Sequence, residues 1–232
     1  MKPTDANRPL RVFDKALRGG LGAGNLGVIM SRRGTGKIAV LTCIAIDHSM
    51  DGKNTLHVAV GKSVSDIRAL HDEVLREILQ SLDLRDSIDH QNNVERHKQI
   101  YTYQDGSFTL DRLNETLDLL ATHADFKPEL IELQGWPDFQ SISESELRTL
   151  KEIAVEHQAE VWLTAQTTRT DNRDERGVPD YVARHEALIE VLVALEPKAD
   201  HVRLRFIKTH KDTPPDGLNL EFDPKTMLIR WR

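Results

Sequence analysis

The sequence predicts an α/β fold, with a mainly parallel central sheet that is flanked by helices and ends in antiparallel strands. Two observations predict it. Between residues 27 and 165, short apolar segments alternate with longer amphipathic segments, a pattern typical of parallel strands joined by crossover helices. After residue 187, apolar segments follow one another with the turn signals PPDG and DPKT between them, which is typical of antiparallel strands.

The elements between residues 27 and 165 are predicted from the spacing of their apolar residues. The segment 37–50 is apolar on nearly every side, as in a buried helix. Ser65 is a candidate N-cap for the next helix, and Ser143 and Glu146 have the spacing of a capping box. We expect strands at 27–30, 55–60, 99–103, 129–133 and 160–165, and helices at 37–50, 65–82, 110–124 and 143–158.

The C-terminal third of the chain differs in composition. Polar residues fill the segment 167–180, which predicts a mobile loop. Three later segments are predicted to form strands joined by turns that extend the same sheet, with the DPKT turn inside the last of them: 187–197, 201–210 and 218–231. Because nothing marks a second hydrophobic core, we expect residues 1–232 to form a single domain, with residues 1–10 as an N-terminal arm.

The overall charge and the apolar runs limit the classes of partner. A net charge of -6 and a pI near 5.9 argue against nucleic acid or an anionic membrane as the main partner, although a local basic patch could still bind DNA. The longest apolar run, 38–46, is too short to span a bilayer, and the polar N-terminus has no signal-peptide pattern. The single cysteine, Cys43, cannot form a disulfide within the chain. We therefore expect a cytoplasmic protein with no membrane partner.

The ten histidines do not form a recognisable metal-binding motif. The segment 71–77, HDEVLRE, lacks the second histidine of the zinc-protease pattern, and His90 and His97 have no cysteines near them. No G-x-S-x-G segment marks a nucleophilic serine. We expect scattered surface histidines and no metal site.

The segment 28–41, VIMSRRGTGKIAVL, resembles a phosphate-binding loop. The pattern G-x-x-x-x-G-K-[ST] holds phosphates on backbone N–H groups and a helix N-terminus, while its lysine reaches the terminal phosphates. This chain keeps Gly34, Gly36 and Lys37 between a predicted strand and a predicted helix, and Ser31 replaces the first glycine. Alternatively, the segment is an ordinary glycine-rich turn.

The surrounding residues carry a wider resemblance. The segment 13–37, FDKALRGGLGAGNLGVIMSRRGTGK, resembles the approach to the core domain of RecA-like ATPases, especially the DnaB-type helicase and KaiC groups. The matching positions are Asp14, Gly19, Gly20, Leu21 and Gly24. With the later segments, the resemblance extends over about residues 10–230. It implies a RecA-like P-loop fold, ATP binding, and assembly as a homo-oligomer or with a RecA-like ATPase partner.

The resemblance also implies roles for individual residues. The nucleotide-binding loop would contain Arg32, Arg33, Gly34, Thr35, Gly36, Lys37 and Ile38. Gln166 ends the segment VWLTAQ at the place of the family's glutamine that senses the terminal phosphate. Lys208 matches the lysine of a K-x-R pair that reaches into the neighbouring subunit's site, whereas His210 stands at the arginine position.

Three departures from the family pattern fall on its catalytic positions. Ile38 replaces the Ser/Thr that binds magnesium, Gln134 replaces the strand-end Asp, and Gly61 stands where the Glu that activates water belongs. Phosphoryl transfer depends on the metal and on an oriented nucleophile. We therefore expect a catalytically degenerate pseudo-ATPase with no catalytic residues, which binds ATP or another nucleotide without tightly bound magnesium. Arg32 and Arg33 would supply part of the missing positive charge, or would instead point to solvent or pair with acids.

Several alternatives remain open. A slow ATPase could recruit Glu132, Asp66 or an acid from a neighbouring chain. A replication or recombination accessory factor could bind DNA through Arg169 and Arg173, but the charges of that loop nearly cancel and no aromatic is interleaved for stacking. A purely structural protein would bind nothing at its glycine-rich loop. The aromatic segment 136–139 could cap a nucleotide, contact another subunit or close the core.

Overall fold

A computed structural model of the chain describes residues 13, 17, 19–84, 88–210 and 219–231. The expected N-terminal arm, residues 1–10, and Asp14 lie outside these residues. The strands are β1 (Leu26–Arg32), β2 (Thr55–Val60), β3 (Lys98–Tyr103), β4 (Leu130–Gln134), β5 (Glu160–Thr167), β6 (Val191–Pro197), β7 (Val202–Lys208), β8 (Leu220–Asp223) and β9 (Leu228–Trp231). The helices are α2 (Lys37–Met50), α3 (Val64–Ser81), α4 (Ile88–His97), α5 (Leu110–His123), α6 (Glu144–Glu156) and α7 (Asp180–Ala183).

The strands form one sheet in the order β3-β2-β4-β5-β1-β6-β7-β8-β9. The first six of these strands are parallel to one another, and β7, β8 and β9 are added in antiparallel pairs. The predicted α/β fold with a mainly parallel sheet and antiparallel C-terminal strands is therefore confirmed. β1 lies in the middle of the sheet, between β5 and β6, so the loop that follows it is centrally placed.

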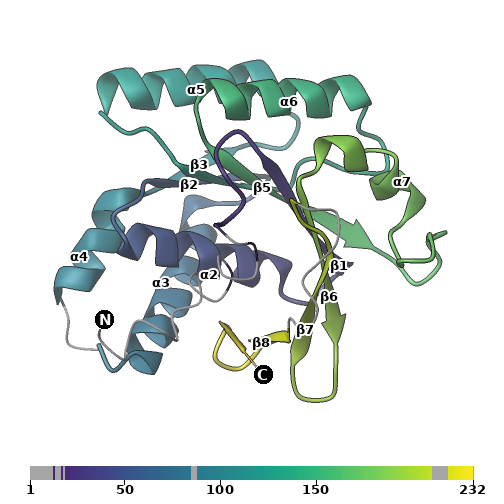
Figure 1. Ribbon diagram of the computed structural model, residues 1–232. Helices are drawn as coiled ribbons and strands as arrows, with labels where there is room; N and C mark the ends of the chain where they lie inside the picture. Colours follow the sequence, from purple (N-terminus) through teal and green to yellow (C-terminus); the bar gives the residue numbers. More distant parts are fainter. Residues whose placement is uncertain (1–12, 14–16, 18, 85–87, 211–218, 232) are drawn as a thin grey trace.

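Helices cover both faces of the sheet (Figure 1). Helices α5 and α6 lie on one face, and α2, α3 and α4 lie on the other. One apolar core lies on each side, and the α2 side also receives residues of β7, β8 and β9. The buried ring of Trp162 on β5 crosses over Gly27 on β1, where an added Cβ would meet a ring atom at 2.5 Å. This contact explains why a glycine lies inside the central strand.

Most of the predicted elements are confirmed, including helix 37–50 at both ends and the capping box of Ser143 and Glu146. Two expectations were wrong in detail. Ser63, not Ser65, caps α3, because its hydroxyl accepts a hydrogen bond from the Asp66 amide at 3.1 Å. The strand predicted from residue 187 begins only at Val191, because a 3₁₀ turn occupies Glu186–Leu188. Helix α4 was not predicted at all.

Candidate functional site

The glycine-rich loop lies at the carboxyl end of β1 and leads directly into α2. Gly34 and Gly36 have φ angles of 77° and 99°, a region that residues with a Cβ rarely adopt. A Cβ on Gly36 would also lie only 2.8 Å from Cε1 of Phe222, whereas nothing lies within 4 Å of one on Gly34. The backbone conformation of the loop therefore favours glycine at both positions. At Gly36, the close contact with Phe222 on β8 also leaves no room for a Cβ.

The N-terminus of α2 lacks a side-chain cap. Gly36 is the N-cap residue, and the first turn of the helix contains no acid. The free N–H groups at such a helix end carry a partial positive charge and are available to an anion. Because α2 is a 14-residue helix behind a loop with two left-handed glycines, this end has the geometry that phosphate groups favour.

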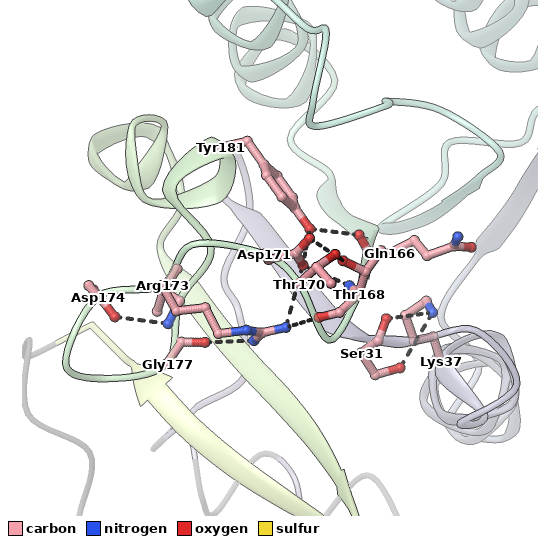
Figure 2. Close-up of polar contacts among 11 residues, drawn as sticks. Ser31, Lys37, Gln166, Thr168, Thr170, Asp171, Arg173, Asp174, Gly177 and Tyr181 are labelled. Atoms are coloured by element: carbon pink, nitrogen blue, oxygen red, sulfur yellow. Dashed lines mark hydrogen bonds and ion pairs between the residues drawn. The ribbon is translucent and has the colours of Figure 1, made fainter.

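Lys37, the first residue of α2, folds its side chain back over the loop. Its Nζ donates to the carbonyl oxygens of Ser31 and Arg32, both at 3.1 Å, and lies 3.4 Å from Ser31 Oγ (Figure 2). Partial burial lowers the pKa of this amine from its ordinary value. The positive charge is thus held by neutral acceptors inside the loop, and an anion at the helix end would be a stronger partner.

Two cavities meet at the loop and share Arg33, Gly34, Gln166 and Thr168. The larger, of about 1040 Å³, reaches past Gly36 to the turns 197–202 and 222–227. The smaller, of about 600 Å³, lies at the carboxyl ends of β1, β4 and β5. All eight loop and strand-end residues that the sequence singles out line one cavity or both: Arg32, Arg33, Gly34, Thr35, Gly36, Lys37, Ile38 and Gln166. Sequence reasoning missed Lys62, which adds another cation to the smaller cavity.

The smaller cavity contains the two positions where magnesium ligands are expected, and they carry Ile38 and Gln134. The Gln134 side chain is already engaged, because its Oε1 lies 3.1 Å from His57 Nε2. Among the described residues that line this cavity, Asp138 is the only acid. Its carboxylate accepts hydrogen bonds from the Gln140 amide and the Ser141 hydroxyl, both at 3.1 Å, and so caps its own turn.

An acid from another segment of the chain lies beside Gly61. A Cβ on Gly61 would lie 2.1 Å from Oδ1 of Asp105, so this carboxylate occupies the space of a side chain at that position. Asp105 follows β3, whose last residue, Tyr103, pairs with Val60 at the end of β2. Only the order of the strands brings the two chain segments together. The sequence signal that could have indicated Asp105 is an acid just after a strand that is parallel to β2 and next to it.

Asp66 and Glu132, the other acids considered from the sequence, make their contacts away from the two cavities. Asp66 accepts a hydrogen bond from Ser63 Oγ at 2.7 Å at the start of α3. Glu132 is buried below Gln134 on β4 and lies 2.7 Å from His57 Nδ1. Neither is among the residues that line the two cavities at the loop.

The aromatic residues after β4 both line the smaller cavity, but they differ in burial. Phe139 is only 2% exposed and belongs to the core on the α5 and α6 side. Trp136 lines the smaller cavity and packs against Phe108, with ring centroids 5.2 Å apart. Of the alternatives raised by the sequence, Phe139 closes the core, whereas Trp136 presents an aromatic ring at the edge of the site.

The polar segment 167–180 is held by contacts of its own (Figure 2). Arg173 donates to the carbonyl oxygens of Thr168 at 2.8 Å and Gly177 at 2.9 Å. The Tyr181 hydroxyl donates to Asp171 Oδ2, at 2.8 Å, and also lies 3.0 Å from the Gln166 carbonyl oxygen. Mobility of this loop remains a prediction, and it would require these contacts to break.

Arg176 is the most strongly engaged arginine of the loop. It forms ion pairs with Asp174 at 2.8 Å and with Glu186 at 2.6 Å. Two of the loop's arginines, Arg173 and Arg176, therefore already have acceptors within the chain, which reduces the positive charge that a DNA backbone would meet.

Lys208 and His210 make their contacts within the chain. Lys208 Nζ donates to the carbonyl oxygens of Glu186 at 2.9 Å and Ile189 at 2.7 Å. The His210 ring bridges Glu190 Oε1 at 2.8 Å and the Gly20 carbonyl oxygen at 2.7 Å. A role for Lys208 and His210 between subunits remains a prediction. In an assembly, contacts with the neighbouring subunit would have to replace these hydrogen bonds within the chain.

Comparison of the chain with models of protein families finds no match, and comparison with curated proteins finds none either. Among the described residues, no helix has both the length and the apolar character needed to cross a membrane. The functional argument therefore depends on the geometry of the site.

Proposed function

We propose that this chain is a catalytically degenerate RecA-like P-loop protein that binds the phosphate groups of a nucleotide without hydrolysing it. It would act as a sensing or structural subunit through association with itself or with an active ATPase. The observation that carries the proposal is the uncapped N-terminus of α2, preceded by two left-handed glycines and bordered by the amine of Lys37.

The surroundings of the loop support binding of an anion. Arg32 and Arg33 line the larger cavity, and Lys62 joins Lys37 at the smaller one. A triphosphate spanning both cavities would meet cations along its whole length. Charge-assisted hydrogen bonds of this kind contribute more than neutral ones.

The same cavities support binding without a tightly held metal. Ile38 offers no oxygen, and the Gln134 amide is neutral and already bonded to His57. A hard cation such as Mg²⁺ prefers carboxylate, hydroxyl and water oxygens. The cationic side chains would therefore carry the charge compensation that magnesium supplies in active ATPases.

Thermal unfolding in the presence of ATP tests the binding site. ATP at millimolar concentration should raise the melting temperature of the wild-type protein. Lys37→Ala should weaken binding by roughly 10- to 150-fold, because one charge-assisted contact contributes about 1.5–3 kcal/mol. Lys127→Ala is the matched control, because this exposed lysine precedes β4 at the opposite edge of the sheet. No shift with ATP, or equal losses in both variants, would refute the proposal.

A slow ATPase is the second candidate, and Asp105 is the observation that favours it. Its carboxylate lies beside Gly61, where the resemblance puts the water-activating Glu, although Asp105, like Asp66 and Glu132, is not among the residues that line the two cavities. Metal-dependent phosphate release that disappears in Asp105→Asn and in Lys37→Ala would establish this activity. Binding of ATP with no phosphate release above the Lys37→Ala background would leave the non-hydrolysing function standing.

A further inference from the structure

A buried polar cluster is formed by His57 on β2, His71 on α3 and Glu132 on β4, and His57 contacts Gln134 at the edge of the smaller cavity. These side chains are at most 2% exposed. His57 Nδ1 lies 2.9 Å from His71 Nε2 and 2.7 Å from Glu132 Oε2. One nitrogen or oxygen from each residue lies within 4.8 Å of the other two, so three possible metal-ligand atoms lie close together.

Hydrogen bonds alone leave this cluster incompletely satisfied. His57 Nδ1 can carry one hydrogen, yet His71 Nε2 and Glu132 Oε2 both lie within bonding distance of it. In the described part of the chain, His71 Nδ1 and Glu132 Oε1 are buried and have no hydrogen-bond partner. Buried polar atoms without partners are rare. A metal bound by both carboxylate oxygens would engage Glu132 Oε1, whereas His71 Nδ1, on the far side of the ring from Nε2, would still have no partner.

The protonation state of His71 also suits a metal ligand. Burial, followed by the nearby His57 and Lys98, lowers the pKa of His71 well below its ordinary value. His71 is therefore a neutral imidazole with a lone pair, which is the form that binds metals.

We propose that His57, His71 and Glu132 bind one divalent transition-metal ion of the zinc type. Two imidazole nitrogens and one carboxylate form a ligand set that zinc accepts, with a small fourth ligand. Tetrahedral coordination at zinc's bond lengths separates ligand atoms by about 3.3 Å. The observed separations of 2.7 and 2.9 Å would thus open by roughly 0.5 Å as the metal replaces the shared hydrogen.

The outer contact of His57 suits this assignment. Metal on His57 Nδ1 leaves its Nε2–H to donate to Gln134 Oε1 at 3.1 Å, the kind of second bond that orients a ligating histidine. Thr42 Oγ1 on α2 lies 3.4 Å from Glu132 Oε2 and could hold the fourth ligand. Through Gln134, metal occupancy would be linked to the edge of the phosphate cavity by a single hydrogen bond.

The charged and titratable groups around the cluster come from three elements. Cys43 and Asp47 lie on α2. Burial raises the pKa of the Cys43 thiol, and the negative charges of Asp47 and Glu132 add to this effect. Lys98 on β3 lies near His71 and forms an ion pair with Glu95 at 2.5 Å. The sequence did not predict the site because its ligands come from three separate elements, with none of the short spacings that define zinc motifs.

The test measures zinc bound per chain after chelator treatment and dialysis against micromolar zinc. The expected result is one zinc per wild-type chain, lost in His71→Gln and in Glu132→Gln. The matched control is His185→Gln, because His185 is also buried and also has an unpartnered Nδ1. It should retain the zinc. Failure of the wild-type to hold zinc, or equal loss in the control, would overturn the proposal.

Two measurements on the wild-type protein keep the proposal testable if the variants fail to fold. Zinc at a hundredfold excess over its dissociation constant should raise the melting temperature by about 5–10 °C. Cobalt should give the intense visible absorption of a tetrahedral ion with nitrogen ligands. A weak, octahedral cobalt spectrum or an unchanged melting temperature would contradict the site.

Discussion

Replacing Gly36 by alanine should destabilise the protein strongly, because two separate penalties fall on one Cβ. The φ angle of 99° disfavours any L-residue, at a cost of about 1–2 kcal/mol. The new Cβ would lie 2.8 Å from Phe222 Cε1, well inside the carbon–carbon contact distance of about 3.5–4.0 Å. Phe222 is 2% exposed and cannot swing away, so overpacking adds about 1–3 kcal/mol.

The expected total is a loss of about 2–5 kcal/mol in the free energy of unfolding, or roughly 4–20 °C in melting temperature. Denaturant titration of both glycine variants separates the two penalties. Gly34→Ala should lose only the conformational part, about 1–2 kcal/mol, because its Cβ would meet nothing within 4 Å. In a Phe222→Leu background, Gly36→Ala should cost about 1–3 kcal/mol less. Equal losses in Gly34→Ala and Gly36→Ala would refute the assigned contact between the loop and β8.

Three further predictions concern other parts of the chain. Ser143→Ala should lower the free energy of unfolding by about 0.5–2 kcal/mol through loss of the capping box, whereas Ser145→Ala should change it little in the same titration. Burial opposes the charge of His210, but its bonds to Gly20 and Glu190 outweigh burial and raise its pKa. His210→Asn should therefore be less stable than wild type below about pH 6, with the difference fading as pH rises through the folded pKa, as measured by denaturant titrations at pH 5.5 and 8. Tyr181→Phe should speed tryptic cleavage within 167–180, because it removes the hydroxyl contacts with Asp171 and Gln166, and an unchanged cleavage rate would contradict that role.

The central elements were predictable because the apolar residues of the sequence mark the positions that the structure buries. Helix 37–50 is apolar on almost every side, and the structure buries it from Val40 to Met50. Helix α4 was not predictable in this way, because Val94 is its only buried residue, Ile88 at its start is exposed and its other positions are polar. The N-cap of α3 was assigned to the wrong serine, because the sequence offers both Ser63 and Ser65 within one turn and only the backbone decides between them.

The loop residues of the candidate site could be found from the sequence because they are adjacent in the chain. Residues that meet through the order of the strands could not. Asp105 comes beside Gly61 only because β3 pairs with β2, and Lys62 faces the loop across the carboxyl edge of the sheet. The cluster of His57, His71 and Glu132 likewise depends on the packing of α3 against the sheet.

The most direct test of the central claim is calorimetric titration of ATP into the purified protein, first with magnesium and then with chelator. The account predicts binding with nearly the same dissociation constant in both buffers, because Ile38 and Gln134 offer magnesium no charged ligand, and loss of that binding in Lys37→Ala. Binding that requires magnesium would contradict the account. No binding in either buffer would also contradict it, and would mean that the segment 31–38 is a turn that binds no nucleotide.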